Sequence, residues 1–234
     1  MTSTTSTLLP IELVVLDMAG TTVVDDGIVE QAFERAARRV GLAGGDSDGL
    51  ETALQYVRDT MGQSKIEVFR HLTAGDEEAA EGANRAFETA YAELIDEVGV
   101  DAIPGAAETI DALRAAGFSV ALTTGFSPET RDAVLGRLGW TVDAVLSPAD
   151  AGRGRPAPDL VLGALVATGA SSVASVAVVG DTVSDIHSGR NAGAGLVIGV
   201  TTGAHTREQL GDAGADLVLD SVRDLAALPQ LQRR

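Results

Sequence analysis

The sequence predicts an α/β protein whose core is a doubly wound, Rossmann-like parallel sheet with an inserted helical cap domain. Two observations carry this prediction. From about Pro104 onward, short apolar runs typical of buried strands alternate with helical patterns. One further strand precedes them near the N-terminus, and it is separated from the others by a long stretch that contains only helical patterns. The helical stretch is therefore an insertion between the first and second strands of the core.

Composition limits the classes of function. The chain has 234 residues, 45% of them hydrophobic, and a formal net charge of −17. A chain this acidic repels nucleic acid and anionic membrane surfaces, so we expect neither as a partner. No apolar run approaches the roughly 20 residues of a membrane span. Cysteine is absent, which excludes thiol chemistry and disulfides. The polar start MTSTTSTLLP resembles an unstructured leader more than a signal peptide, and we expect a cytoplasmic protein.

The first strand is the run Leu13–Leu16, which stops at Asp17. A turn of small residues follows, Ala19 to Thr22. Open α/β sheets bind their ligands at the carboxyl ends of the strands, and such a turn presents backbone N–H groups to anions. Asp17 is therefore a candidate nucleophile or metal ligand beside a phosphate-sized pocket.

Residues 24–99 are predicted to form the helical cap domain, and residues 1–23 and 100–234 the core domain. The apolar spacing predicts helices over 30–40, 50–58, 64–72 and 76–98, separated early on by a loop rich in Gly and Asp over 41–49. Ser64 and Glu67 have the spacing of a capping box at the start of the third helix. Gly27 and the stretch 99–104 interrupt these patterns, so we expect them to act as hinges.

The core then resumes its alternation. Helices are predicted over 106–116, 128–138, 158–168, 184–192 and 206–210, and strands over 118–122, 144–146, 176–179, 196–200 and 217–219.

Polar residues follow four of the strands and are expected to meet at one edge of the sheet. They are Asp17, Thr124, Arg155 in GRGRPAP, and Asp181 with Asp185 in GDTVSD. Asp17 and Asp181, with a backbone carbonyl and waters, suit Mg²⁺, which prefers oxygen ligands. Thr124 and Arg155 suit phosphoryl oxygens. Singly, Asp185 could cap a helix and Arg155 could be a surface charge, but their shared position at strand ends favours one site.

This set of residues resembles the haloacid dehalogenase superfamily of Mg²⁺-dependent aspartyl-nucleophile hydrolases, over nearly the whole chain from Leu13. The resemblance implies that Asp17 attacks phosphorus and that Thr124 and Arg155 orient the phosphoryl group. It also implies that the metal is bound by Asp17, Asp181 and the carbonyl of Ala19, with support from Asp185.

Ala19 is a departure from most phosphatases of this superfamily, which have an aspartate there as the general acid. The motifs DMAGTT and GDTVSD and the pair Arg155–Pro156 resemble the phosphonatase branch, which hydrolyses phosphonoacetaldehyde and has alanine at this position. That branch uses a cap lysine to form an imine with the aldehyde. The segment MGQSKIEVF resembles its cap segment, placing Lys65 as the imine lysine and Met61 beside the substrate. Gly125 and Thr21 are further candidate substrate contacts, and the resemblance implies a homodimer formed through the cap.

Lys65 is the only lysine in a chain with 17 basic residues. Arginine cannot form an imine, because its guanidinium stays charged, so the choice of lysine here favours amine chemistry.

Other features of that branch are missing. Val68 replaces a cap histidine, Ile28 or a neighbour replaces a cysteine, and Met18 and Phe126 replace aromatic residues near the site. These changes favour a phosphonatase-like hydrolase of altered specificity. One alternative is a phosphomonoester phosphatase or mutase, similar to phosphoglycolate phosphatase, with Lys65 as a phosphate clamp. A second is a non-catalytic binding module. A dinucleotide-binding domain is disfavoured, because no G-x-G-x-x-G follows the first strand.

Overall fold

The core of the protein is a six-stranded parallel sheet, as the sequence predicted, and its strand order is β3-β2-β1-β4-β5-β6. The computed structural model describes residues 9–42 and 47–232. The strands are β1 (Leu13–Asp17), β2 (Ser119–Thr123), β3 (Ala144–Leu146), β4 (Val176–Gly180), β5 (Leu196–Val200) and β6 (Leu217–Leu219). The central strand β1 is buried along its whole length, as expected for a strand covered on both faces.

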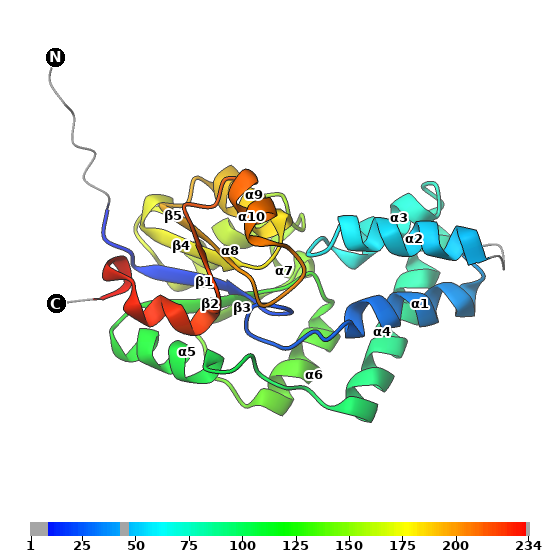
Figure 1. Ribbon diagram of the computed structural model, residues 1–234, viewed down its shortest axis with the longest axis horizontal. Coiled ribbons are helices and arrows are strands. Elements are labelled where there is room, and N and C mark those ends of the chain that lie inside the picture. Colours follow the sequence, from blue (N-terminus) through cyan, green and yellow to red (C-terminus); the bar gives the residue numbers. More distant parts are fainter. Residues whose placement is uncertain (1–8, 43–46, 233–234) are drawn as a thin grey trace, which may run out of the picture.

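Helices cover both faces of this sheet (Figure 1). Side chains of β1 alternate between two apolar clusters: Leu13 and Val15 join one, and Val14 and Leu16 join the other. The first cluster includes residues of α8 (Asp159–Thr168), α9 (Val183–Ala192) and α10 (Arg207–Asp212). The second includes residues of α5 (Ala106–Ala115), α6 (Pro128–Leu138) and the 3₁₀ helix η2 (Val222–Ala227).

Between β1 and α5 the described chain forms four helices that lie beyond the carboxyl edge of the sheet (Figure 1). They are α1 (Ile28–Val40), α2 (Ser47–Asp59), α3 (Lys65–Leu72) and α4 (Glu77–Val98), and we call residues 28–98 the helical segment. Its centre holds Phe33, Phe69 and Phe87, with ring centroids 4.7–6.2 Å apart. These rings belong to the same apolar cluster as Val14 and Leu16, so the core and the helical segment are packed together.

Four short elements were not predicted from the sequence: α7 (Pro148–Ala151) and the 3₁₀ helices η1 (Val173–Ser175), η2 and η3 (Pro229–Leu231). The predicted capping box at Ser64 was wrong. Ser64 is the N-cap of α3 but makes no capping hydrogen bond, and Glu67 pairs instead with Arg70. The predicted leader falls mostly in residues 1–8, and part of the loop predicted over 41–49 falls in 43–46; both stretches lie outside the described residues.

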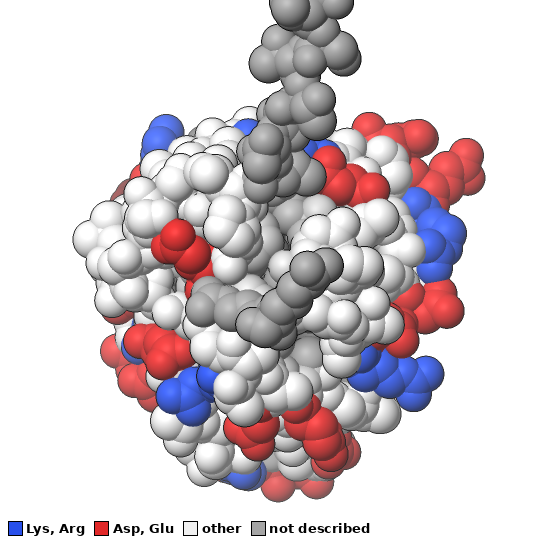
Figure 2. Space-filling model, turned by 90° about the vertical axis from the view of Figure 1, so that its left-hand side faces the viewer, with Lys and Arg blue, Asp and Glu red and all other residues white. Residues whose placement is uncertain are grey.

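Figure 2 shows the end of the core that faces away from the helical segment, where basic side chains are scattered among acidic ones. Within residues 9–42 and 47–232, no helix is both long enough and apolar enough to cross a membrane.

Candidate active site

The predicted site residues meet at the carboxyl edge of the sheet. Asp17 is the last residue of β1 and is paired with Thr123, so Thr124 follows directly beside it. Asp181 comes immediately after β4, the other neighbour of β1. Because the three central strands are parallel and in register, side chains that follow them are held at one place.

Asp17, Asp181 and Asp185 form a buried acidic cluster, with carboxylate oxygens within 4.8 Å of one another. Thr21 Oγ1 donates to Asp181 Oδ1 at 2.8 Å, and the Ala204 amide donates to Asp181 Oδ2 at 2.9 Å. Asp185 accepts from the Thr182 amide at 3.1 Å in the capping box that starts α9. Asp185 thus takes part in capping α9, whose N-cap is Thr182, and is also a member of the cluster.

Arg155 is the cation that the protein places on this cluster. Its Nη1 donates to Asp17 Oδ1 at 2.5 Å and also to Asp185 Oδ1. Only 5% of the residue is exposed, and its Nε has no hydrogen-bond partner among the described residues. Burial by itself would lower the pKa of Arg155, but the carboxylates of Asp17 and Asp185 outweigh burial and raise it. The unpaired Nε is a donor available to an anionic ligand.

The charge balance of the cluster fits a divalent cation. Burial raises the pKa of Asp17 well above its usual value, and the charge of Arg155 only partly opposes this. Burial, with the charge of Asp185, likewise raises the pKa of Asp181 to about 7. The three buried carboxylates carry more negative charge than the one guanidinium can neutralise. All the atoms that they offer to a metal are oxygens. This is the donor set that Mg²⁺ prefers.

The turn after β1 is closed by its own hydrogen bonds. The amides of residues 20–23 donate to carbonyls of Met18 and Val23 within the turn. The expectation that this turn presents its backbone N–H groups to an anion was therefore wrong for residues 20–23. Gly20 has a φ of +86°, and a Cβ there would lie 2.5 Å from Asp181 Oδ2, so glycine is required for the close approach to the acidic cluster.

Lys65 reaches this site from the helical segment. It is the first residue of α3 and is 7% exposed. Its Nζ lies 5.9 Å from the ring centroid of Phe33 and 5.5 Å from that of Phe126. Within the described chain it makes no ion pair shorter than 4.0 Å. Burial lowers the pKa of Lys65 to about 8, and the nearby charge of Asp25 partly opposes this shift.

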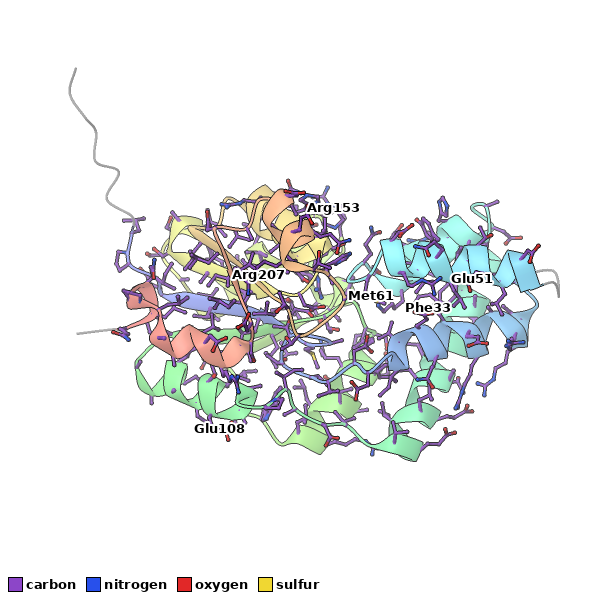
Figure 3. All side chains as sticks on the ribbon, viewed as in Figure 1. Phe33, Glu51, Met61, Glu108, Arg153 and Arg207 are labelled. Atoms are coloured by element: carbon purple, nitrogen blue, oxygen red, sulfur yellow. The ribbon has the colours of Figure 1, made fainter. Side chains whose placement is uncertain are left out.

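A cavity of about 20 Å³ joins the two regions. Predicted site residues line it from both: Asp17, Ala19, Met61, Lys65, Thr124, Gly125, Arg155 and Asp181. Thr21 and Asp185 lie outside its lining, and Thr21 contacts Asp181 instead of the cavity. Figure 3 shows Met61 where the helical segment meets the core. The volume is that of about one water molecule, so the site is closed around its reactive groups.

Close backbone contacts hold the helical segment against the core. A Cβ on Gly125 would lie 2.6 Å from the Gln63 carbonyl oxygen, and one on Gly62 would lie 2.4 Å from Thr182 Oγ1. The loop just before Lys65 therefore fits against the loops that follow β2 and β4.

Two acidic residues near Lys65 were missed by the sequence reasoning. Asp25 lines the same cavity, and Glu88 lines a neighbouring cavity of about 160 Å³ that also contains Lys65, Gly125 and Phe126. The site residues of the core were predicted because they follow the carboxyl ends of strands. Neither Asp25 nor Glu88 directly follows a strand, so this criterion could not identify them.

Comparison with known proteins gives a consistent picture. The sequence model of the haloacid dehalogenase-like hydrolases matches residues 11–193. The phosphonoacetaldehyde hydrolase of Bacteroides fragilis is 30% identical over 94% of this chain and 96% of its own. That of Nitratidesulfovibrio vulgaris is 27% identical over 92% and 88%.

Solved structures agree with these sequence matches. The phosphonoacetaldehyde hydrolase-like protein of Oleispira antarctica has a TM-score of 0.78 at 25% identity, covering 97% of this chain and 94% of its own. A hydrolase from Pseudomonas syringae has a TM-score of 0.80 at 22% identity, over 94% and 97%, and shares the fold.

Proposed function

The chain belongs to the haloacid dehalogenase-like hydrolase family, and from this premise we propose that it cleaves the carbon–phosphorus bond of phosphonoacetaldehyde or a related phosphonate. The observation that carries the proposal is the position of Lys65. The only lysine of the chain lies buried in the same small cavity as Asp17, Thr124 and Arg155. An amine for a carbonyl group and a carboxylate for phosphorus are thus within reach of one small substrate.

In this proposal Lys65 acts first. Its amine attacks the aldehyde carbon and forms a protonated imine with loss of water. Burial lowers the pKa of Lys65 to about 8, which favours this step because more of the amine is neutral and nucleophilic. The carboxylate of Asp17 then attacks phosphorus. The electron pair of the carbon–phosphorus bond passes to the imine, which leaves an enamine on Lys65 and a phosphoryl group on Asp17. Water hydrolyses both adducts, releasing phosphate and the aldehyde.

The remaining residues position the phosphonate. Thr124 and Arg155 bind its oxygens, and the unpaired Nε of Arg155 is a ready donor. Asp17, Asp181 and the carbonyl of Ala19 would hold Mg²⁺, with Asp185 supporting them; the ion would offset the repulsion between the Asp17 carboxylate and the phosphonate. Thr21 holds Asp181 in place by its hydrogen bond.

The small volume of the cavity supports a moving cap. Space of about 20 Å³ does not admit a phosphonate, so we propose that residues 24–99 form a domain that opens for the substrate and then closes. Met61 and Gly125 line the closed cavity and would contact the bound substrate. Val68 and Phe126 stand in place of the branch's histidine and tyrosine, which favours an altered specificity with the same chemistry. Phosphonoacetaldehyde serves as the probe of that chemistry in the experiments below.

The second candidate is a phosphomonoester phosphatase or mutase in which Lys65 is only a phosphate clamp. Ala19 lines the cavity where such enzymes need a proton donor for the leaving alkoxide, and losing that donor costs roughly 10²–10⁴-fold in rate. Ordinary phosphate esters should therefore be poor substrates.

Replacing Lys65 with arginine separates the two candidates. Arg keeps the charge and binds phosphate well, but it forms no imine. We expect Lys65→Arg to lose turnover of phosphonoacetaldehyde by at least the roughly 10²–10⁴-fold of a lost catalytic proton-transfer group. Release of phosphate from phosphonoacetaldehyde, and from phosphoglycolate as the ester control, measures it. Turnover of either substrate by Lys65→Arg within a few-fold of an efficient wild type would favour the clamp.

By resemblance we propose a homodimer formed through the helical segment, acting on a small molecule in the cytoplasm. The lack of cysteine is compatible with a reducing compartment. Light scattering on the purified protein gives the oligomeric state.

A further inference from the structure

The proposed reaction needs a group that moves protons near Lys65. Forming the imine requires a proton for the aldehyde oxygen and the removal of one from nitrogen, and protonating the enamine requires another. Ala19 lines the cavity and Val68 lies one turn after Lys65 in α3, but neither side chain can donate a proton. Some other group near Lys65 must carry these protons.

The cavity lining narrows the choice. Its ionisable residues are Asp17, Asp25, Lys65, Arg155 and Asp181. In the proposed function Asp17 is the nucleophile, Asp181 is a metal ligand, and Lys65 carries the imine. Arg155 does not lose its proton in the accessible pH range. Asp25 is the member of this set that has no assigned task.

Asp25 is well placed for the task. It lies between the turn after β1 and α1, where its Oδ1 accepts a hydrogen bond from the Val29 amide at 3.0 Å. Its other carboxylate oxygen makes no hydrogen bond within the described part of the chain. Asp25 and Lys65 line the same cavity of about 20 Å³, so the carboxylate and the amine lie close together. In keeping with this, the charge of Asp25 is, after burial, the largest influence on the pKa of Lys65.

The charged groups around the pair come from several elements. Asp25 is influenced by Lys65, Asp26 and Glu30, and Lys65 also by Arg155, Asp17 and Glu88. Burial raises the pKa of Asp25, so its protonated form persists to higher pH than that of an exposed aspartate. Tyr91 of α4 is also near, and burial raises its pKa far above the ordinary value, which keeps it neutral.

Glu88 is the other carboxylate near Lys65, but it is already engaged. It accepts from Ser127 Oγ at 2.9 Å and also from Thr130 Oγ1. These contacts tie α4 to the start of α6. Glu88 lines the neighbouring cavity and is absent from the lining of the cavity that holds Asp17.

We propose that Asp25 is the acid–base residue for the imine steps at Lys65. This inference rests on the proposed function. The protonated carboxyl of Asp25 gives its proton to the aldehyde oxygen while the Lys65 nitrogen bonds to carbon. The carboxylate then takes a proton from that nitrogen and returns it to the hydroxyl, which leaves as water. The product is the protonated imine. Imine formation leaves Asp25 as a carboxylate, which then takes up a proton from solvent water. After phosphoryl transfer, Asp25 gives this proton to the enamine carbon, and as a carboxylate it then takes a proton from the water that attacks the resulting imine, which frees Lys65.

The test measures imine formation apart from phosphoryl transfer. In the Asp17→Asn background the carbon–phosphorus bond stays intact, so borohydride with phosphonoacetaldehyde leaves a 2-phosphonoethyl group on Lys65. The rate of this labelling is compared between Asp17→Asn and Asp17→Asn with Asp25→Asn. Asparagine keeps an oxygen for the Val29 amide, so the start of α1 is preserved.

The two possible roles of Asp25 predict opposite changes in the labelling rate of Asp25→Asn. If Asp25 moves protons, Asp25→Asn slows labelling at every pH, by roughly 10²–10⁴-fold. If it is only a neighbouring charge, removing it lowers the pKa of Lys65 further, and labelling at neutral pH becomes faster. Asp26→Asn is the matched control, since Asp26 is exposed and lies outside the cavity lining, and its labelling rate should stay within about twofold of the parent.

Each outcome decides the matter. Slow labelling in Asp25→Asn with normal labelling in Asp26→Asn supports the proposal. Unchanged or faster labelling in Asp25→Asn overturns it and leaves the proposed function intact. No labelling of Lys65 in the Asp17→Asn parent overturns both. Circular dichroism of each variant confirms that the fold is retained.

Discussion

The carboxyl edge of the sheet and the helical segment supply the site in different ways. At the sheet edge, the register of β1 with β2 and β4 fixes Asp17, Thr124 and Asp181, and hydrogen bonds from Thr21 and Ala204 hold Asp181. In the helical segment, Lys65 is placed by a loop whose backbone fits against Gly125 and Thr182. Lys65 itself makes no ion pair within the described residues. The side chains at the sheet edge are thus held by contacts within the core, whereas the position of Lys65 depends on the fit between two regions.

Loss of the nucleophile should have the largest effect. Asp17→Asn keeps the shape of the side chain but removes the attacking carboxylate, so turnover should fall by roughly 10⁴-fold or more, as for nucleophiles that act as part of a catalytic unit. Phosphate release from phosphonoacetaldehyde measures it. Substantial residual turnover would contradict covalent catalysis at the sheet edge.

Breaking the fit between the regions should have a smaller effect. In Gly125→Ala the new Cβ would lie 2.6 Å from the Gln63 carbonyl oxygen, which would push away the loop that carries Lys65. Because a misplacement of about 1 Å can cost roughly 10²-fold in rate, we expect a loss of turnover of about that size. Gly136→Ala is the matched control, because nothing lies within 4 Å of a Cβ at that position in α6. Equal activity of the two variants would show that close contact at Gly125 is unimportant.

The smallest of these effects is that of pH. Burial lowers the pKa of Lys65 to about 8, and only the neutral amine is a nucleophile, so acetylation of Lys65 by acetic anhydride, which needs no proton from Asp25, should become faster with pH and level off above about 8. Below that value its rate should fall about tenfold per pH unit. A midpoint near the ordinary lysine value, about 10.4, would mean that Lys65 is exposed to solvent when it reacts.

The residues that directly follow strands could be assigned to the site from the sequence alone. The strand pattern and the strand-end rule were sufficient to group Asp17, Thr124, Arg155 and the aspartates of GDTVSD. Asp25 was missed, since its approach to Lys65 depends on the packing of α1 against α3 and α4. The role of Thr21 was also missed, because its hydrogen bond to Asp181 joins residues 160 positions apart. The prediction of a capping box at Ser64 was wrong, since the side chain of Glu67 forms an ion pair with Arg70 instead.

The central claim is that Lys65 of the helical segment and Asp17 of the sheet edge act in turn on one substrate molecule. The most direct measurement is mass spectrometry of Lys65 after borohydride treatment with phosphonoacetaldehyde. In the wild type, cleavage precedes reduction, so the account predicts an ethyl group on Lys65. In Asp17→Asn it predicts a 2-phosphonoethyl group on the same residue. An unmodified Lys65 in both proteins, or the same adduct in both, would contradict the account.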